Sequence, residues 1–229
     1  MVIIMDPEYA PDTILSDYEI GLRNALSETW PSCTIRGCYF HFMQALMRKV
    51  QEFGLMADYY VVGSDIRKAV KRISALPFLL YDEVLSAWDC LRETLPDDLH
   101  AFTTYCEYTW IGTPQRRALF PPETWNQYDA TLAILPRSSN LAEGWHNGWR
   151  SLIQHSNPVI WTFLDALLEQ QAETELQIAD WMMRKPAPTG HAKFREADKK
   201  VEELIGEYDN GFYNDVLDYL DCVSTALSH

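Results

Sequence analysis

The chain has 229 residues and a mass of 26.5 kDa, and 47% of its residues are hydrophobic, which is enough for one substantial core or one core with an appended helical lobe. Its 19 Lys and Arg residues against 33 Asp and Glu residues give a formal net charge of −14, which argues against broad electrostatic attraction to DNA. No apolar run reaches the roughly 18 residues that a membrane span needs, so no membrane partner is expected.

The start of the chain gives no sign of export. Met1–Met5 is apolar, but Asp6 follows at once and no basic stretch precedes the apolar run. The five cysteines are an odd number without the dense spacing of a disulfide framework. We therefore predict a reduced protein of the nucleus or the cytoplasm, not a secreted one.

Residues 1–55 form the first predicted segment and begin with a strand–helix pattern. Val2–Met5 is either a strand remnant or the end of an N-terminal helix. A brief strand through Thr13–Leu15 is predicted to end at Asp17, ahead of a helix over residues 18–29. From this pattern alone, Asp17 is an N-cap between strand and helix.

A second strand is predicted over Cys33–Gly37, followed by a helix that ends near Gly54. The second segment, residues 56–135, is almost wholly helical in pattern. Prolines separate its clearest helical stretches, which lie near residues 65–75, 78–94 and 97–109.

The stretch Leu135–Trp149 opens the third segment, residues 136–184. Short oxygen side chains suited to capping a helix precede an amphipathic pattern that starts near Leu141. Leu141, Trp145, Trp149 and Leu152 fall on its apolar side, and Glu143, Asn147, Arg150 and Gln154 on the opposite side. The pattern alone makes Glu143 a first-turn acid that the helix dipole favours.

A long helix is predicted from Ser156 to Met183, opened by Asn157-Pro158. The fourth segment, residues 185–229, starts with the linker-like Lys185–Gly190. Helices near residues 191–206 and 212–226 are expected to follow it.

Several blocks of this sequence resemble the catalytic domain of Mutator-like element (MULE) transposases. Asp17-Tyr18-Glu19 is similar to the family's Asp-Phe-Glu, and Arg36–Phe42 to its Gly-Cys-x-x-His block. The Trp-Ile-Gly … Phe-Pro … Trp-Asn block has its counterpart between Trp110 and Asn126. The family's Arg-Thr-Asn-Asn-like run and its Glu-Gly-Trp-His-Asn block correspond to Arg137, Ser138, Ser139, Asn140, Glu143, Gly144, Trp145, His146 and Asn147. The resemblance covers the chain from about Pro11 onward.

The resemblance implies a mostly α fold with an α+β remnant: a truncated RNase H-like core with one or two short strands, a large all-helical insertion and a helical C-terminal tail. It also implies that Asp17 and Glu143 are the second and third acids of an Asp-Asp-Glu set. In the family these acids bind Mg²⁺ or Mn²⁺ and cleave and join DNA at terminal repeats. Asp17, at a strand end, and Glu143, on a helix against the sheet, are then expected to share one metal-binding cleft.

The family's first acid lies on an opening strand well upstream of the second. Met1 lies too close to Asp17 for that strand, and Asp6 is the only nearby stand-in. We therefore expect a MULE-type transposase fragment that is inactive as this chain. Two alternatives are a co-opted, transposon-derived binding or scaffold protein without catalysis, and a plain helical interaction module. Missing strands would leave an exposed sheet edge open to a protein partner or a second copy.

The Cys38-x-x-His41 pair is half of a zinc site, with Cys33, His100 and Cys106 as possible completers. A buried structural Cys38 without zinc is the favoured interpretation. The role of Arg137, Asn140 and His146 within their block stays open. A basic cluster, either a phosphate-binding surface or a solvated helix face, comprises Arg36, Arg48, Lys49, Arg67, Lys68, Lys71 and Arg72.

Overall fold

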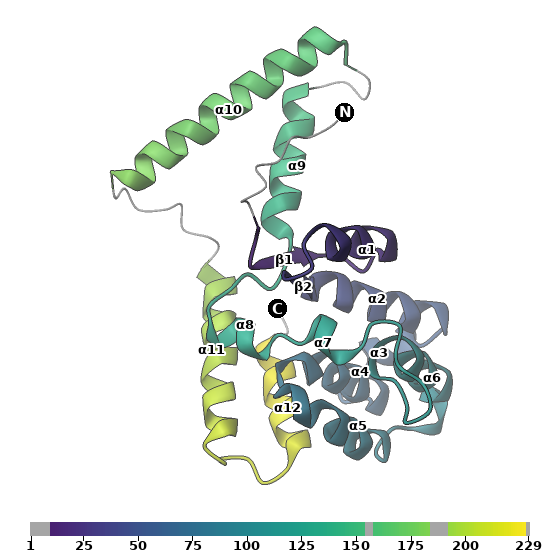
Figure 1. Ribbon diagram of the computed structural model, residues 1–229. Coiled ribbons are helices and arrows are strands. Elements are labelled where there is room, and N and C mark those ends of the chain that lie inside the picture. Colours follow the sequence, from purple (N-terminus) through teal and green to yellow (C-terminus); the bar gives the residue numbers. More distant parts are fainter. Residues whose placement is uncertain (1–9, 154–157, 184–191, 228–229) are drawn as a thin grey trace. The chain divides into compact units, whose positions relative to one another are not determined.

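The computed structural model describes residues 10–153, 158–183 and 192–227, which form a mostly helical chain with one small sheet (Figure 1). Helices account for 69% of the residues and strands for 5%. The predicted mostly α class with short strands is therefore confirmed. Among the described residues, no helix combines the length and the apolar character that crossing a bilayer requires.

The chain divides into two compact units. Unit 1 consists of residues 1–138 together with residues 196–229, and unit 2 consists of residues 139–195. Unit 1 is therefore built from two stretches of sequence that lie on either side of unit 2.

The sheet of unit 1 has two parallel strands, β1 (Thr13–Ser16) and β2 (Thr34–Gly37), joined by helix α1 (Ile20–Thr29). Thr13 pairs with Thr34 at one end of the register, and Ser16 pairs with Gly37 at the other. The strand–helix–strand order is the one predicted from the sequence. The consequence for the site is that both strands end at the same edge.

A helical body follows β2. Its first member is α2 (Tyr39–Glu52), whose residues Phe42, Leu46 and Val50 recur at helical spacing and are buried. The other α-helices of unit 1 are α3 (Met56–Tyr60), α4 (Asp65–Ala75), α5 (Val84–Arg92), α6 (His100–Cys106), α7 (Pro122–Trp125), α8 (Tyr128–Leu132) and α12 (Val216–Ala226), together with α11 (Ala192–Asp209) from Glu196 onward.

The core of unit 1 joins the two stretches of its sequence. Helix α12 packs on α4, and its Tyr219 is fully buried with its hydroxyl donating to the carbonyl oxygen of Phe78, 2.7 Å away. Beside this contact, Nε and Nη2 of Arg72 donate to the two carboxylate oxygens of Asp221, each at 2.7 Å. An apolar core and a bidentate ion pair thus hold α12 in place.

The stretches near 78–94 and 97–109 are more broken than predicted. Short 3₁₀ turns η1 (Leu76–Phe78) and η2 (Tyr81–Glu83) precede α5, and η3 (Asp97–Leu99) precedes α6. Pro77 and Pro96 separate these stretches from the helices before them, and the first stretch is broken at Leu79, which is extended with a ψ of 155°. A π-helical turn, η4 (Glu107–Ile111), extends α6 and ends at Gly112, whose φ of 88° favours glycine.

Unit 2 contains α9 (Asn140–Ile153) and α10 (Ile160–Met182), both predicted from the sequence. The rings of Trp149 and Phe163 meet edge to face at 5.8 Å, and Ile153 and Ala166 are buried. The end of α9 therefore packs on the start of α10. The predicted helix start at Ser156-Asn157 and the linker Lys185–Gly190 lie outside the described residues.

Candidate functional site at the strand ends

The candidate site lies where β1 and β2 end. The N–H of Cys38 donates to the carbonyl oxygen of Ser16 across 2.8 Å, which extends the strand pairing by one bond. Asp17 and Cys38, each the first residue after its strand, therefore stand side by side at the carboxyl edge of the sheet. Polar residues at this edge are well placed for ligand binding.

Asp17 is half-buried, and its Oδ1 accepts the N–H of Glu19 at 3.2 Å. Glu19, not Asp17, occupies the N-cap position of α1, so the pattern-based N-cap role of Asp17 is wrong. Nearby, Arg23 donates to Ser16 Oγ and to the carbonyl oxygen of Ile35, each at 3.1 Å. Arg23 thus ties α1 to both strands, and its burial lowers the pKa of its guanidinium.

Tyr18 packs on the backbone of Gly37. Its ring lies 4.8 Å from that of Trp110 and 5.1 Å from that of Phe120, both edge to face. The hydroxyl is buried and has no hydrogen-bond partner among the described residues. Burial, followed by the neighbouring Cys38, raises the pKa of Tyr18. Tyr18 therefore serves as a packing group beside the strand ends.

Cys38 is fully buried, as predicted, at the start of α2. His41 lies in the first turn of α2, with its ring 5.5 Å from that of Phe40. Among the described residues, no three His, Cys, Asp or Glu side chains gather into a metal-binding group. The structure thus does not bring Cys33, His100 or Cys106 together with this pair as zinc ligands.

Arg137 is attached to the same edge from a distant part of the sequence. The N–H of Tyr39 donates to its carbonyl oxygen at 2.8 Å. Its guanidinium, 5.2 Å from the centre of the Phe78 ring, forms an ion pair with Asp198. Burial lowers the pKa of Arg137. The observed contacts make Arg137 an anchor between the strand ends and α11.

Gln127 is a central residue of the site that sequence reasoning missed. It is fully buried, and its Nε2 donates to the carbonyl oxygens of Gly37, at 3.0 Å, and Trp125, at 3.1 Å. Its Oε1 accepts Arg36 Nη2 at 2.7 Å. The only sequence signal is its position directly after the Trp125-Asn126 pair, because nothing local marks a glutamine as buried.

The remaining predicted site residues belong to unit 2 or to the start of the chain. Glu143 and Asn140 lie in α9, but their side chains are outside the described residues, as is the whole of Asp6. His146 is exposed on α9, with its ring 5.3 Å from that of Trp145. The metal-binding roles of Asp17 and Glu143 stay predictions.

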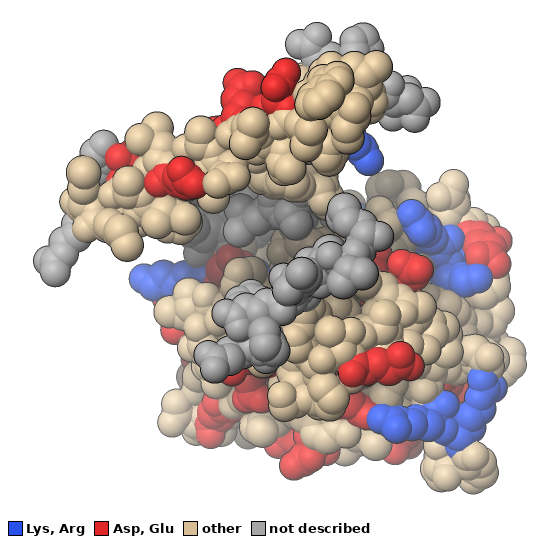
Figure 2. Space-filling view, turned by 45° about the horizontal axis from the view of Figure 1, so that its top comes forward, with Lys and Arg blue, Asp and Glu red and all other residues tan. Residues whose placement is uncertain are grey.

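Part of the basic cluster is paired with acids. Lys68 and Arg72 pair with Asp221, and Lys49 pairs with Glu52. On the face shown in Figure 2, Lys and Arg side chains occur in small separate groups among Asp and Glu side chains. Their local fields are therefore largely offset by neighbouring acids.

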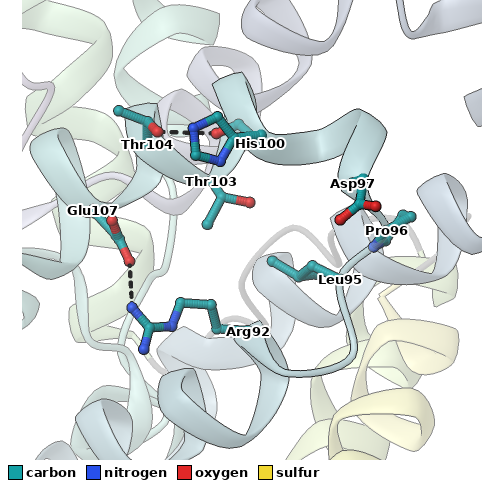
Figure 3. Close-up of a pocket in the computed structure, with 8 residues that line it drawn as sticks. All are labelled: Arg92, Leu95, Pro96, Asp97, His100, Thr103, Thr104 and Glu107. Carbon is teal, nitrogen blue, oxygen red and sulfur yellow. Dashed lines mark hydrogen bonds and ion pairs between the residues drawn. The ribbon is translucent and has the colours of Figure 1, made fainter.

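A separate open groove of about 340 Å³ lies between α5 and α6 (Figure 3). Arg92 and Glu107 form an ion pair at 3.3 Å on one side of it. Its lining consists of Arg92, Leu95, Pro96, Asp97, His100, Thr103, Thr104 and Glu107. Apart from His100, none of the predicted site residues lines this groove.

Comparison of the chain with protein-family models, with curated proteins and with solved structures finds no match. The geometry of the strand ends is therefore the observation on which a functional proposal rests.

Proposed function

We propose that this chain corresponds to the C-terminal part of a MULE-type transposase catalytic domain, with β1, α1 and β2 as its portion of an RNase H-like core. In this proposal Asp17 and Glu143 are two of the carboxylates that bind Mg²⁺ or Mn²⁺ next to DNA. Both ions accept oxygen ligands, which suits this pair of acids.

The observation that carries the proposal is the meeting of separate sequence blocks at one sheet edge. Tyr18, from the Asp-Phe-Glu-like block, packs on Gly37, from the Gly-Cys-x-x-His-like block, and on Trp110, from the Trp-Ile-Gly-like block. Arg137, from the last block, bonds to Tyr39. These residues from four of the resembling blocks are thus neighbours in unit 1, whereas Glu143–Asn147 belong to unit 2.

The attachment of Arg137 also bears on Glu143. Glu143 follows Arg137 by six positions, which an extended chain spans in at most roughly 20 Å. The end of the first stretch of unit 1, a few positions before Glu143, is therefore tethered beside the strand ends that carry Asp17. This tether supports the proposal that both carboxylates serve one ion.

Two carboxylates are enough to hold one divalent ion weakly, but not a pair of close ions. Two such ions repel each other strongly and need several negative ligands to offset the repulsion. Within the described residues, which do not include the Glu143 side chain, no three acids, histidines or cysteines gather into a metal-binding group. We therefore expect weak binding of a single ion and no DNA cleavage by this chain alone.

Titration of the full chain with Mn²⁺, followed by electron paramagnetic resonance, tests the proposal. Asp17→Asn and Glu143→Gln should each weaken Mn²⁺ binding by about tenfold or more, because each removes one charged ligand. Asp12→Asn, at the opposite end of β1, and Glu169→Gln, exposed on α10, are the matched controls and should leave binding unchanged.

Equal Mn²⁺ affinities in all variants would refute the shared site. A plasmid-nicking assay with Mn²⁺ adds a second readout, in which we expect no nicking. If the wild-type chain nicks the plasmid and Glu143→Gln abolishes the nicking, the proposed relation to MULE transposases would stand, but the expected inactivity would be wrong.

A second candidate is a transposon-derived binding or scaffold protein without catalysis. Two observations favour it: the net charge of −14 and the internal pairing of Lys49, Lys68 and Arg72 with acids. Fluorescence anisotropy with labelled duplex DNA separates the candidates. A protein that contacts phosphates shows affinity that falls steeply with salt, whereas this second candidate predicts no DNA binding at low salt.

A further inference from the structure

Helix α10 presents an apolar face that unit 2 does not cover. Helix α9 reaches α10 through Trp149 and Phe163, and Ala166 is the buried residue of α10. Large apolar side chains elsewhere on α10 are exposed, including Trp161 at 73% and Met182 at 81%. Figure 2 shows such uncharged surface in tan, interrupted by a few acids.

The exposed residues follow a seven-residue repeat. Counted from Ile160, alternating steps of four and three residues along α10 lead to seven residues on one side of the helix. We call this row of residues the α10 seam. Its members, in the order d, a, d, a, d, a, d, are Ile160, Leu164, Leu167, Gln171, Thr174, Ile178 and Trp181. A repeat of 3.5 residues over three heptads is the pattern of a two-helix coiled coil.

The apolar members of the seam are accessible for such a contact. Ile160, Leu164, Leu167, Ile178 and Trp181 expose between 37 and 61% of their surface. Flanking e positions add Trp161, Leu168 and Met182, which expose 63 to 81%. Since a large side chain presents roughly 150–250 Å², these eight present on the order of 1,000 Å². The area is divided between the two ends of α10, and its sum is comparable with about 800 Å² per partner in a standard interface.

The polar members of the seam indicate the partner. Gln171 and Thr174 occupy adjacent core layers at the middle of α10, where Gln171 Nε2 donates to Glu175 Oε1 at 2.8 Å and Thr174 Oγ1 donates to the carbonyl oxygen of Gln170 at 2.9 Å. These bonds leave the amide oxygen and the second amide hydrogen of Gln171, which a hydrophobic peptide groove would not satisfy. In a parallel, in-register pair of identical helices, each meets its own copy and can hydrogen-bond to it. One polar a position is a known means of fixing register and the two-stranded state.

The charges of α10 agree with a symmetric pair. Helix α10 contains five acids and no Lys or Arg. Four of them, Asp165, Glu169, Glu173 and Asp180, fall at b, c and f positions away from the seam. Glu175 is at an e position, and its Oε1 accepts Gln171 Nε2 at 2.8 Å. The seam itself therefore carries no charge that would repel its copy.

We propose that α10 is a dimerisation helix, which pairs along the α10 seam with α10 of a second copy of this chain as a parallel coiled coil. This pairing does not depend on metal binding at Asp17 and Glu143.

Sedimentation equilibrium of the full chain tests the pairing. Leu167→Glu places a charge in the seam and should raise the dimer Kd by about tenfold or more. Leu176→Glu is the matched control, since Leu176 is exposed at 64% on the same helix but at an outer f position. It should leave the Kd unchanged. Gln171→Leu should tighten association and admit higher oligomers, because it removes the polar layer.

Disulfide cross-linking tests the register. Gln171→Cys in the seam should cross-link between copies, and Glu169→Cys at the outer f position should not, both in a background with the exposed Cys90 and Cys222 replaced by Ser. A wild-type chain that stays monomeric would overturn the proposal. So would equal effects of the two Leu→Glu changes, no tightening by Gln171→Leu, or cross-linking at 169 that matches cross-linking at 171.

Discussion

A β-carbon added at Gly37 would lie 2.4 Å from the hydroxyl oxygen of Tyr18. The strand end and the aromatic ring are thus in direct contact, with no room for a side chain between them. Trp110 and Phe120 hold the Tyr18 ring from other directions, so the ring cannot easily withdraw. Close packing at this edge of the sheet therefore requires that residue 37 has no β-carbon.

Gly37→Ala should lower the free energy of unfolding by about 1–3 kcal/mol, the range for overpacked cores. Urea unfolding measures the loss. Gly206→Ala in α11, where nothing lies within 4 Å of the added carbon, is the control and should be neutral or slightly stabilising. In a Tyr18→Ala background the cost of Gly37→Ala should shrink, because the obstructing ring is gone. An undiminished cost would refute the contact.

Gln127→Met should lower the free energy of unfolding by about 2–4 kcal/mol. The substitution keeps the length of the side chain but removes its bonds to Gly37, Trp125 and Arg36, which leaves buried polar groups without partners. The matched change Gln51→Met, at an exposed position of α2, should stay within about 0.5 kcal/mol of wild type. Similar losses for both variants in urea unfolding would contradict this role of Gln127.

Asp221→Asn should destabilise unit 1 by about 1–3 kcal/mol, because it breaks a bidentate pair with Arg72. The Arg72 side chain is only 10% exposed, whereas that of Asp221 is 34% exposed, which places the loss below that of a fully buried pair. Asp218→Asn, exposed on the same helix, should cost no more than about 0.5 kcal/mol. Thermal unfolding of both variants checks the difference, and equal melting temperatures would argue against the pair.

Stability should fall as the pH rises above 10. Burial raises the pKa of Tyr105 to about 12 from an ordinary value of 10.0, and it also raises the pKa of Tyr39 and Tyr219. Above pH 10 the unfolded chain releases these protons while the folded chain retains them, so rising pH favours unfolding. The contribution of these tyrosines to stability is fully present below pH 10. The contribution of Tyr105 is lost as the pH rises through about 12.

Urea unfolding at a series of pH values measures this dependence. Tyr105→Phe removes one of the titrating groups and should reduce the slope of unfolding free energy against pH above 10. An unfolding free energy that stays constant above pH 10, in the wild-type chain, would show that these tyrosines titrate freely.

Elements with strong local signals were predictable from the sequence. Helix α4 begins after Ser64, whose hydroxyl accepts the N–H of Arg67 as an N-cap should. Helix α2 stops before Gly54, whose φ of 73° suits a helix end. The strand pair is also local, because α1 joins β1 directly to β2.

Features that depend on distant partners were not predictable. Nothing near Gln127 indicates that it will be buried against β2, and nothing near Arg72 indicates a partner in α12. The π-helical turn Glu107–Ile111 carries Trp110, whose ring packs on Tyr18 from a distant part of the sequence. For the candidate site, the sequence indicated Asp17 at a strand end and Cys38 in the interior, but gave no sign of the contacts that hold Arg137.

The place of α12 in the core has a consequence for how the protein is made. Tyr219, Leu220 and Val223 are fully buried against helices synthesised much earlier. During synthesis, the apolar side of those helices stays exposed until residue 226 has emerged from the ribosome. All of unit 2 has been synthesised before that point. A polypeptide stalled before α12 would expose this side to chaperones and proteases. The core of unit 1 is therefore completed by a helix that is synthesised after unit 2.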